Sequence, residues 1–230
     1  MFLYNKSMIN DFKFPFNGIE NINQNYSQAL QDMFVLSVLD GKRDGTFLEI
    51  GAFDAQFLSN TYLLEKEYNW NGTSIDINES TRTTFNSSER KSKVIIDDAI
   101  KLDYNLILSG ITDYRCDYLS LDIEPMTNTL ECLKKLPLDN FRFSVITYEH
   151  DYYDPNFDRT TAYAVRQESR DILEFKGYVL VNPSVENIGE DEFEDWYIDG
   201  TYFNDSIINK FKRNNSIPLK ARCYMLDNVE

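Results

Sequence analysis

The sequence predicts a doubly wound α/β domain, in which helices cover both faces of a mostly parallel sheet of seven strands. Predicted strands alternate with predicted helices along most of the 230 residues. The strands are apolar on both faces, which is typical of parallel strands buried between two helical layers. Acidic residues follow the ends of five strands, the edge where ligands of such sheets bind.

The chain is expected to form a single domain over residues 25–230, preceded by an N-terminal arm over residues 1–24. The arm is irregular, so we expect it to lie on the domain or to be partly disordered. Ser27 is a good N-cap residue and is predicted to start the first helix, which Gly41 stops in a left-handed conformation. Apolar residues recur between them at helical spacing, namely Leu30, Phe34, Val35, Val38 and Leu39.

The remaining elements alternate in type. Strands are predicted at residues 46–50, 72–77, 93–97, 117–122, 141–148, 177–181 and 194–199. Helices are predicted at residues 59–68, 127–135 and 160–175. The acidic run over residues 190–195 is interpreted as a solvated loop that leads into the seventh strand.

Acidic residues outnumber basic ones by 38 to 23, which gives a net charge of −15. The chain has no basic run that would attract phosphates, so nucleic acid and anionic membranes are not expected as partners. Neither a signal-peptide core nor a membrane-spanning segment is evident. Three distant cysteines, Cys116, Cys132 and Cys223, favour reduced thiols and a cytoplasmic location.

The acidic strand ends indicate a ligand site. Five strand ends carry these residues: Glu49 and Asp54, Asp76, Asp97 and Asp98, Asp122 and Glu124, and Glu149 and Asp151. Because the carboxyl ends of parallel strands meet at one edge of the sheet, we expect the side chains to face a common cleft.

The spacing of Gly51 and Asp76 indicates which ligand enters that cleft. Asp76 lies 25 residues after Gly51, at the end of the second strand, where a carboxylate can accept both hydroxyls of a ribose. The turn at Gly51 lacks the further glycines that a pyrophosphate needs, so NAD is disfavoured. A ribose without phosphate suits S-adenosylmethionine. Alternatively, Gly51 only makes a tight turn and Asp76 only caps a helix.

Several segments together resemble the FkbM family of S-adenosylmethionine-dependent O-methyltransferases. The resemblance runs from about Tyr26 to Asp199 and rests on residues 26–28 with 31–32, 47–52, 59–61, 117–124 and 177–178. It implies a seven-stranded Rossmann-like methyltransferase fold and methyl transfer to a hydroxyl of a sugar, a glycan or another small molecule.

The resemblance also implies site residues. Glu49 and Gly51, with Ala52 and Phe53, match the first cofactor motif; Asp76, with Ile77, matches the ribose-binding acid; Asp98 and Ala99 border adenine; Ser59 and Asn60 lie near the methionine end; and Asp122 shapes the pocket. The chain departs from the family at Phe53-Asp54-Ala55, where Asn-Asp-Gly is common, so Ala55 is expected to disturb the loop geometry.

The catalytic candidates lie at the ends of the fourth and fifth strands, which are expected to be neighbours in the sheet. Asp122 and His150 should then open onto one cleft, which the acceptor enters from the side of the fifth strand. His150, the only histidine, is a candidate general base because imidazole titrates near neutral pH; alternatively it is structural. Glu149, Asp122 and Glu124 are the other catalytic candidates. Asp122, Glu149 and Asp151 could hold Mg²⁺ through oxygen ligands, or Asp122 and Glu124 could simply shape the cofactor pocket.

Two functional classes follow. The first is an S-adenosylmethionine-dependent O-methyltransferase with a small-molecule or glycan acceptor. The second is a non-catalytic nucleotide- or glycan-binding module on the same fold. Arg166, Ser169 and Arg170 form a cluster that makes structural salt bridges, fixes the acid-rich loop or binds polar groups of a substrate. The oligomeric state is left open.

Overall fold

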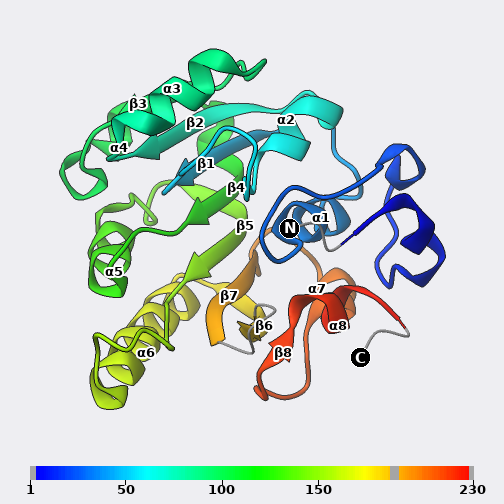
Figure 1. Ribbon diagram of the computed structural model, residues 1–230. Coiled ribbons are helices and arrows are strands. Elements are labelled where there is room, and N and C mark those ends of the chain that lie inside the picture. Colours follow the sequence, from blue (N-terminus) through cyan, green and yellow to red (C-terminus); the bar gives the residue numbers. More distant parts are fainter. Residues whose placement is uncertain (1–3, 187–191, 228–230) are drawn as a thin grey trace.

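The computed structural model describes residues 4–186 and 192–227. Eight strands form one sheet in the order β3-β2-β1-β4-β5-β7-β6-β8 (Figure 1). The pairs among β1 to β5 are parallel, whereas β7 runs antiparallel to β5 and β6. The strands are β1 (Thr46–Ile50), β2 (Asn71–Asp76), β3 (Lys93–Ile96), β4 (Arg115–Leu121), β5 (Arg142–Glu149), β6 (Tyr178–Glu186), β7 (Glu192–Asp199) and β8 (Leu219–Lys220).

The predicted fold class is therefore confirmed, with one short strand more than expected. The additional strand, β8, has two residues and lies at the edge of the sheet. The neighbouring positions of β4 and β5, on which the expected acceptor side depends, are present.

Helices cover both faces of the sheet. Figure 1 shows α4, α5 and α6 on one side, and α1, α2 and the N-terminal segment on the other. The helices are α1 (Gln31–Val38), α2 (Tyr62–Tyr68), α3 (Glu79–Ser87), α4 (Tyr104–Leu108), α5 (Met126–Lys135), α6 (Arg159–Phe175), α7 (Asp205–Phe211) and α8 (Ala221–Met225). Four short 3₁₀ helices join them: Lys6–Asp11, Ile19–Asn21, Ala99–Lys101 and Thr112–Tyr114.

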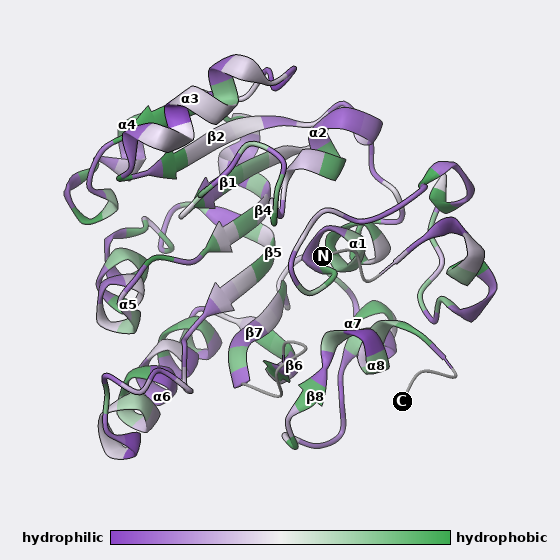
Figure 2. Ribbon diagram, in the orientation of Figure 1, coloured by the Kyte–Doolittle hydropathy of each residue, from purple (hydrophilic) through white to green (hydrophobic). Residues whose placement is uncertain are grey.

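The apolar residues form one large cluster on each face of the sheet. Alternate residues of β4 point to opposite clusters: Tyr118 packs with α1, whereas Leu119 and Leu121 pack with α5. In Figure 2 hydrophobic residues accordingly run along the central strands. Two buried faces explain why the strands read as nearly continuous apolar runs in the sequence.

The N-terminal segment contributes side chains to the core. Tyr4, Phe12 and Phe16 are buried, and Phe12 makes an antiparallel bridge with Leu226 near the other end of the chain. Residues 4–24 thus lie on the domain, as expected of an arm, and they also complete the cluster around α1.

The first helix begins later than predicted. Ser27 does not start it, because Leu30 adopts a left-handed conformation with φ of 66° and the helix begins at Gln31. The Asp32 carboxylate accepts hydrogen bonds from the Tyr26 and Ser27 backbone N–H groups and from the Ser27 hydroxyl. This buried carboxylate folds residues 26–30 into a turn ahead of the helix.

The acidic run before the seventh strand is not a solvated loop where the structure describes it. Glu190 and Asp191 lie outside the described residues. Glu194 and Asp195 belong to β7 and are buried. Strand β7 lies between β5 and β6, so its side chains point into the two covered faces of the sheet.

Candidate functional site

A pocket of about 610 Å³ opens at the carboxyl ends of β1, β2, β3 and β4. Among the residues that the structure describes, six acidic residues line it, and no lysine, arginine or histidine does. The acidic residues are Glu49, Asp76, Asp97, Asp98, Asp122 and Glu124. Of the residues expected at the cofactor, the pocket also contains Gly51, Ala52, Phe53, Asn60, Ile77 and Ala99. Acidic residues from four of the five strand ends thus meet at this pocket, whereas Asp54, Glu149 and Asp151 do not line it.

Asp76 connects the end of β2 to the loop after β1. One oxygen, Oδ2, accepts a hydrogen bond from the Phe53 backbone N–H at 2.8 Å. The other, Oδ1, accepts from the Asn78 backbone N–H at 2.7 Å and from its amide at 3.0 Å. A carboxylate offers about four acceptor positions, so Asp76 keeps capacity for a further donor in the pocket. Ile77, the next residue, is 68% exposed beside it.

In the loop after β1, Phe53 adopts a left-handed backbone conformation and Ala55 does not. Phe53 has a φ of 51°, the left-handed region, whereas Ala55 does not and is buried. The disturbance expected at Ala55 is therefore absent. Phe53 is 61% exposed at the pocket, and its ring lies 6.5 Å from that of Phe57.

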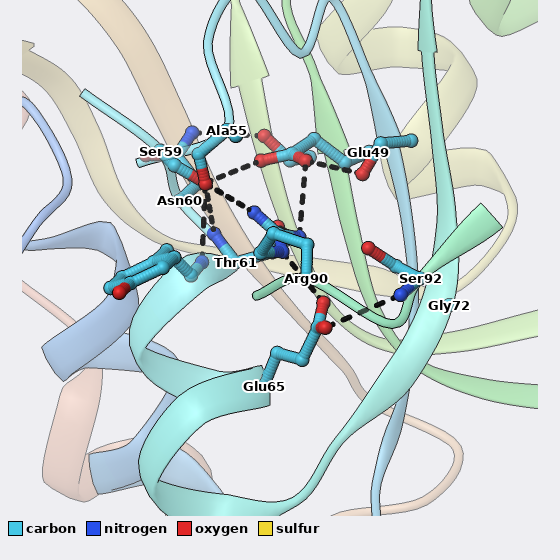
Figure 3. Close-up of polar contacts among 12 residues, drawn as sticks. Glu49, Ala55, Ser59, Asn60, Thr61, Glu65, Gly72, Arg90 and Ser92 are labelled. Atoms are coloured by element: carbon cyan, nitrogen blue, oxygen red, sulfur yellow. Dashed lines mark hydrogen bonds and ion pairs between the residues drawn. The ribbon is translucent and has the colours of Figure 1, made fainter. Parts of the chain in front are cut away.

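Glu49 and Ser59 belong to a buried network around Arg90, a residue that the sequence did not point to (Figure 3). The Arg90 guanidinium donates to Glu65 at 2.6 Å, to the Thr61 hydroxyl at 2.8 Å and to the Ser59 hydroxyl at 3.2 Å. It also lies 3.9 Å from Glu49, whose other contacts include the Ser74 hydroxyl at 2.7 Å.

This network changes the interpretation of two expected cofactor residues. Ser59 is 2% exposed and does not line the pocket; its hydroxyl accepts from the Thr61 and Tyr62 backbone N–H groups at the start of α2. Glu49 lines the pocket, but its carboxylate already accepts a hydrogen bond from the Ser74 hydroxyl. Burial raises the pKa of Glu49, and the Arg90 charge acts against that shift.

Asn60 is oriented toward the pocket by β4. Its amide donates to the Ser120 hydroxyl at 2.9 Å. Its Oδ1 atom is buried and has no hydrogen-bond partner among the described residues. A buried acceptor of this kind needs a donor, and a ligand can supply one.

Asp98 and Ala99 form the far wall of the pocket. Asp98 caps the following 3₁₀ helix by accepting from the Ile100 backbone N–H at 3.1 Å, and it pairs with Lys101 at 2.9 Å. The hydrogen bond from Lys101 lowers the pKa of Asp98. Ala99 is buried and lines the pocket beside Asp98.

Asp122, Glu149 and Asp151 form a cluster of carboxyl groups that share hydrogen bonds. Burial raises the pKa of Asp122 to about 6. Burial and the adjacent charge of Asp122 raise the pKa of Glu149 well above its ordinary value. Hydrogen bonds between carboxyl groups require a proton, so the cluster holds at least one near neutral pH.

The expected magnesium site is not supported. Within residues 4–186 and 192–227, no group of three or more His, Cys, Asp or Glu side chains is arranged to hold a metal ion. Asp122, Glu149 and Asp151 lie close together, and burial raises the pKa of all three carboxyl groups.

His150 does not face the pocket, contrary to the expectation that it opens onto a cleft with Asp122. It is fully buried on the side of the sheet covered by α6. Its Nδ1 accepts a hydrogen bond from the Tyr152 backbone N–H at 3.2 Å, and its Nε2 lies 3.6 Å from Asp195. Neither nitrogen is placed to take a proton from a ligand in the pocket.

A second hollow of about 410 Å³ adjoins the pocket at Glu124, which lines both. Its other lining residues are Pro125, Asp151, Tyr153, Asp154 and Asn156. It lies on the side of β4 and β5 where the acceptor was expected. A larger hollow, of about 790 Å³, lies at the amino ends of the strands and contains none of the expected site residues.

Comparisons with known proteins bear on the fold. No family model matches the chain. No curated protein matches it either.

Among the described residues, no helix is both long and apolar enough to cross a membrane.

Solved structures with a similar fold include S-adenosylmethionine-dependent methyltransferases. One from Aquifex aeolicus is 17% identical with a TM-score of 0.47, over 74% of this chain and 92% of that one. A methyltransferase from Pyrococcus furiosus is 12% identical with a TM-score of 0.47, over 74% and 82%. A fibrillarin pre-rRNA processing protein from Methanococcus jannaschii is 20% identical with a TM-score of 0.47, over 69% and 68%.

Proposed function

We propose that the protein is an S-adenosylmethionine-dependent methyltransferase of the FkbM type, which methylates a hydroxyl of a sugar, a glycan or another small molecule. The observation that carries this proposal is the lining of the 610 Å³ pocket, with six acids and no basic residue. S-adenosylmethionine carries a sulfonium and an ammonium but only one carboxylate, so it suits such a lining. The carboxylates of the lining would repel a nucleotide phosphate.

The side chains of the pocket fit the parts of that cofactor. Asp76 would accept the ribose hydroxyls, and Ile77 and Ala99 would border the adenine. The unpartnered Oδ1 of Asn60 offers an acceptor at the other end of the pocket, near Asp122. When bound, the cofactor supplies an electrophilic methyl group.

The acidic cluster supplies the base in this proposal. Asp122 lines the pocket and shares a proton with Glu149, so an ionised oxygen and a protonated one lie next to the position of transfer. A carboxylate with a pKa of about 6 is ionised at neutral pH and accepts a hydroxyl proton better than an ordinary aspartate. The hollow beyond Glu124 would orient the acceptor.

Calorimetry tests the proposal. S-adenosylmethionine and S-adenosylhomocysteine should both bind the folded protein, whereas NADH, which carries phosphates in place of a methionine moiety, should bind much more weakly. Transfer of a labelled methyl group to a panel of monosaccharides and glycans then separates catalysis from binding. Absence of binding of both sulfur compounds at high micromolar concentration would reject the proposal. Binding with no transfer to any acceptor would favour the non-catalytic module.

A further inference from the structure

The loop after β5 forms one wall of the 410 Å³ hollow and is held by β7. Asp151 and Tyr153 line the hollow. The backbone N–H groups of His150 and Asp151 donate to the Phe193 carbonyl at 2.7 and 3.1 Å. Asp151 has a φ of 41°, a left-handed conformation that is uncommon for residues other than glycine.

His150 is at the centre of the contacts that hold this loop. Its Nδ1 accepts a hydrogen bond from the Tyr152 backbone N–H at 3.2 Å. Nε2 lies 3.6 Å from an Asp195 oxygen and has no hydrogen-bond partner among the described residues. The ring is fully buried, so its position is determined by these neighbours and not by solvent.

Asp195 is itself held rigidly by α6 and β6. Arg170 donates to both of its oxygens, at 2.7 and 2.9 Å. The Ser184 backbone N–H donates to the same carboxylate at 2.8 Å. Burial alone would raise the pKa of Asp195, but His150 and Arg170 hold it below its ordinary value. Asp195 therefore stays ionised and fixed in position beside the imidazole.

Helix α6 makes a second contact with the loop through the cluster that begins at Arg166. The Arg166 guanidinium lies 3.7 Å from the centroid of the Tyr152 ring. The Arg159 guanidinium lies 4.8 Å from the centroid of the same ring and donates to the Tyr152 carbonyl at 2.7 Å. The ring and backbone of Tyr152 are thus held from α6, while its N–H is held by His150.

We propose that His150 is a positioning residue. Packed beside the Asp195 carboxylate that Arg170 fixes, it holds the turn that carries Asp151 and Tyr153 into the wall of the hollow. Identification of the hollow as the acceptor side rests on the proposed function; the positioning itself rests only on the contacts above. The cluster of Arg166 and Arg170 then acts on the site through the loop and not through contact with a substrate.

Amide hydrogen exchange of the ligand-free protein tests the proposal. His150→Leu removes the acceptor for Tyr152, and the backbone N–H groups of Asp151, Tyr152 and Asp154 should exchange at least about tenfold faster. His150→Asn places an oxygen near the former position of Nδ1 and should restore much of the protection. Arg142→Met is the matched control, because Arg142 pairs with Asp199 at 2.5 Å at the opposite end of β5. It should leave the loop amides unchanged.

Two outcomes would overturn the proposal. One is faster exchange at Tyr152 alone, with Asp151 and Asp154 still protected. The other is an equal acceleration throughout β4, which indicates global destabilisation. If His150→Leu fails to fold, the double variant Arg170→Met/Asp195→Asn removes the other end of the chain of contacts and should give the same local pattern. S-adenosylhomocysteine affinity, which should stay within about twofold of the parent, reports separately on the proposed function.

Discussion

Gly51 lies directly against the backbone of Asp122, at the point where β1 and β4 end. A Cβ atom on Gly51 would lie 1.5 Å from the Asp122 carbonyl oxygen, and the φ of Gly51 is +90°. The Asp122 backbone N–H in turn donates to the Ile50 carbonyl at 2.9 Å. Glycine is therefore needed here for two reasons, its conformation and the close approach of the two strands.

Gly51→Ala should destabilise the protein by more than about 3 kcal/mol, because the β1 and β4 ends must separate and a left-handed alanine is strained. Urea unfolding measures the effect. Gly110→Ala is the control, since a Cβ there meets nothing within 4 Å and should change the free energy of unfolding little. Equal stability of the two variants would show that the strand ends can separate without cost.

Arg90→Met should cost about 3–5 kcal/mol, because it leaves Glu65 and Glu49 without their buried counter-charge. The guanidinium side chain is 1% exposed, so water cannot replace it. Arg82→Met removes an exposed pair with Glu79 and should cost less than about 1 kcal/mol. A comparable loss in both variants would argue against the stabilising role of the buried network.

Local patterns predicted the parts of the fold that depend on neighbouring residues. Strand β1 has the predicted bounds, and α5 and α6 each begin one residue earlier than predicted. Helix α3 was not predicted, because it is rich in threonine, serine and asparagine, which have low helical propensity. Its burial of Thr81 and Phe85 stabilises it through tertiary contacts.

The acidic strand ends could be predicted because parallel strands bring their carboxyl ends to one edge. The roles of Arg90 and His150 could not. The partners of Arg90 lie 25 to 41 residues before it in the chain, from Glu65 to Glu49, and no local spacing signals that encounter. His150 does not line the pocket and lies beside Asp195 of β7, the strand next to β5. The acidic run around Asp195 is interpreted from the sequence as a solvated loop, so this neighbour could not be predicted.

Asp76→Ala should weaken the binding of S-adenosylhomocysteine about ten- to a hundredfold, since it removes a charged acceptor for the ribose and releases the Phe53 loop. Calorimetry measures the dissociation constant. Asp139→Ala, which changes an exposed carboxylate paired with Lys176, is the control and should bind as the parent does. A dissociation constant unchanged by Asp76→Ala would remove this residue from the proposed ribose site.

Glu194→Gln should make the stability of the protein less dependent on pH. Glu194 is buried in β7, where it accepts from the Trp196 indole at 2.6 Å and from the Gln31 amide at 3.0 Å. Burial raises its pKa to about 8, and the charge of Asp122 adds to the shift. An unfolded glutamate titrates near pH ~4.3. The folded protein therefore holds a proton that the unfolded chain has released. The stabilisation from this group is complete below the pKa of the unfolded glutamate and is lost as the pH rises through about 8, the pKa in the folded protein.

Glutamine keeps an acceptor oxygen for both donors but cannot ionise. Between pH ~6 and ~8.5 the free energy of unfolding of the parent should fall by on the order of 2 kcal/mol relative to the variant, measured in urea at several pH values. Glu131→Gln, at an exposed position that pairs with Lys134, should follow the parent curve. Parallel curves for Glu194→Gln and the parent would mean that Glu194 is already ionised in the folded protein at neutral pH.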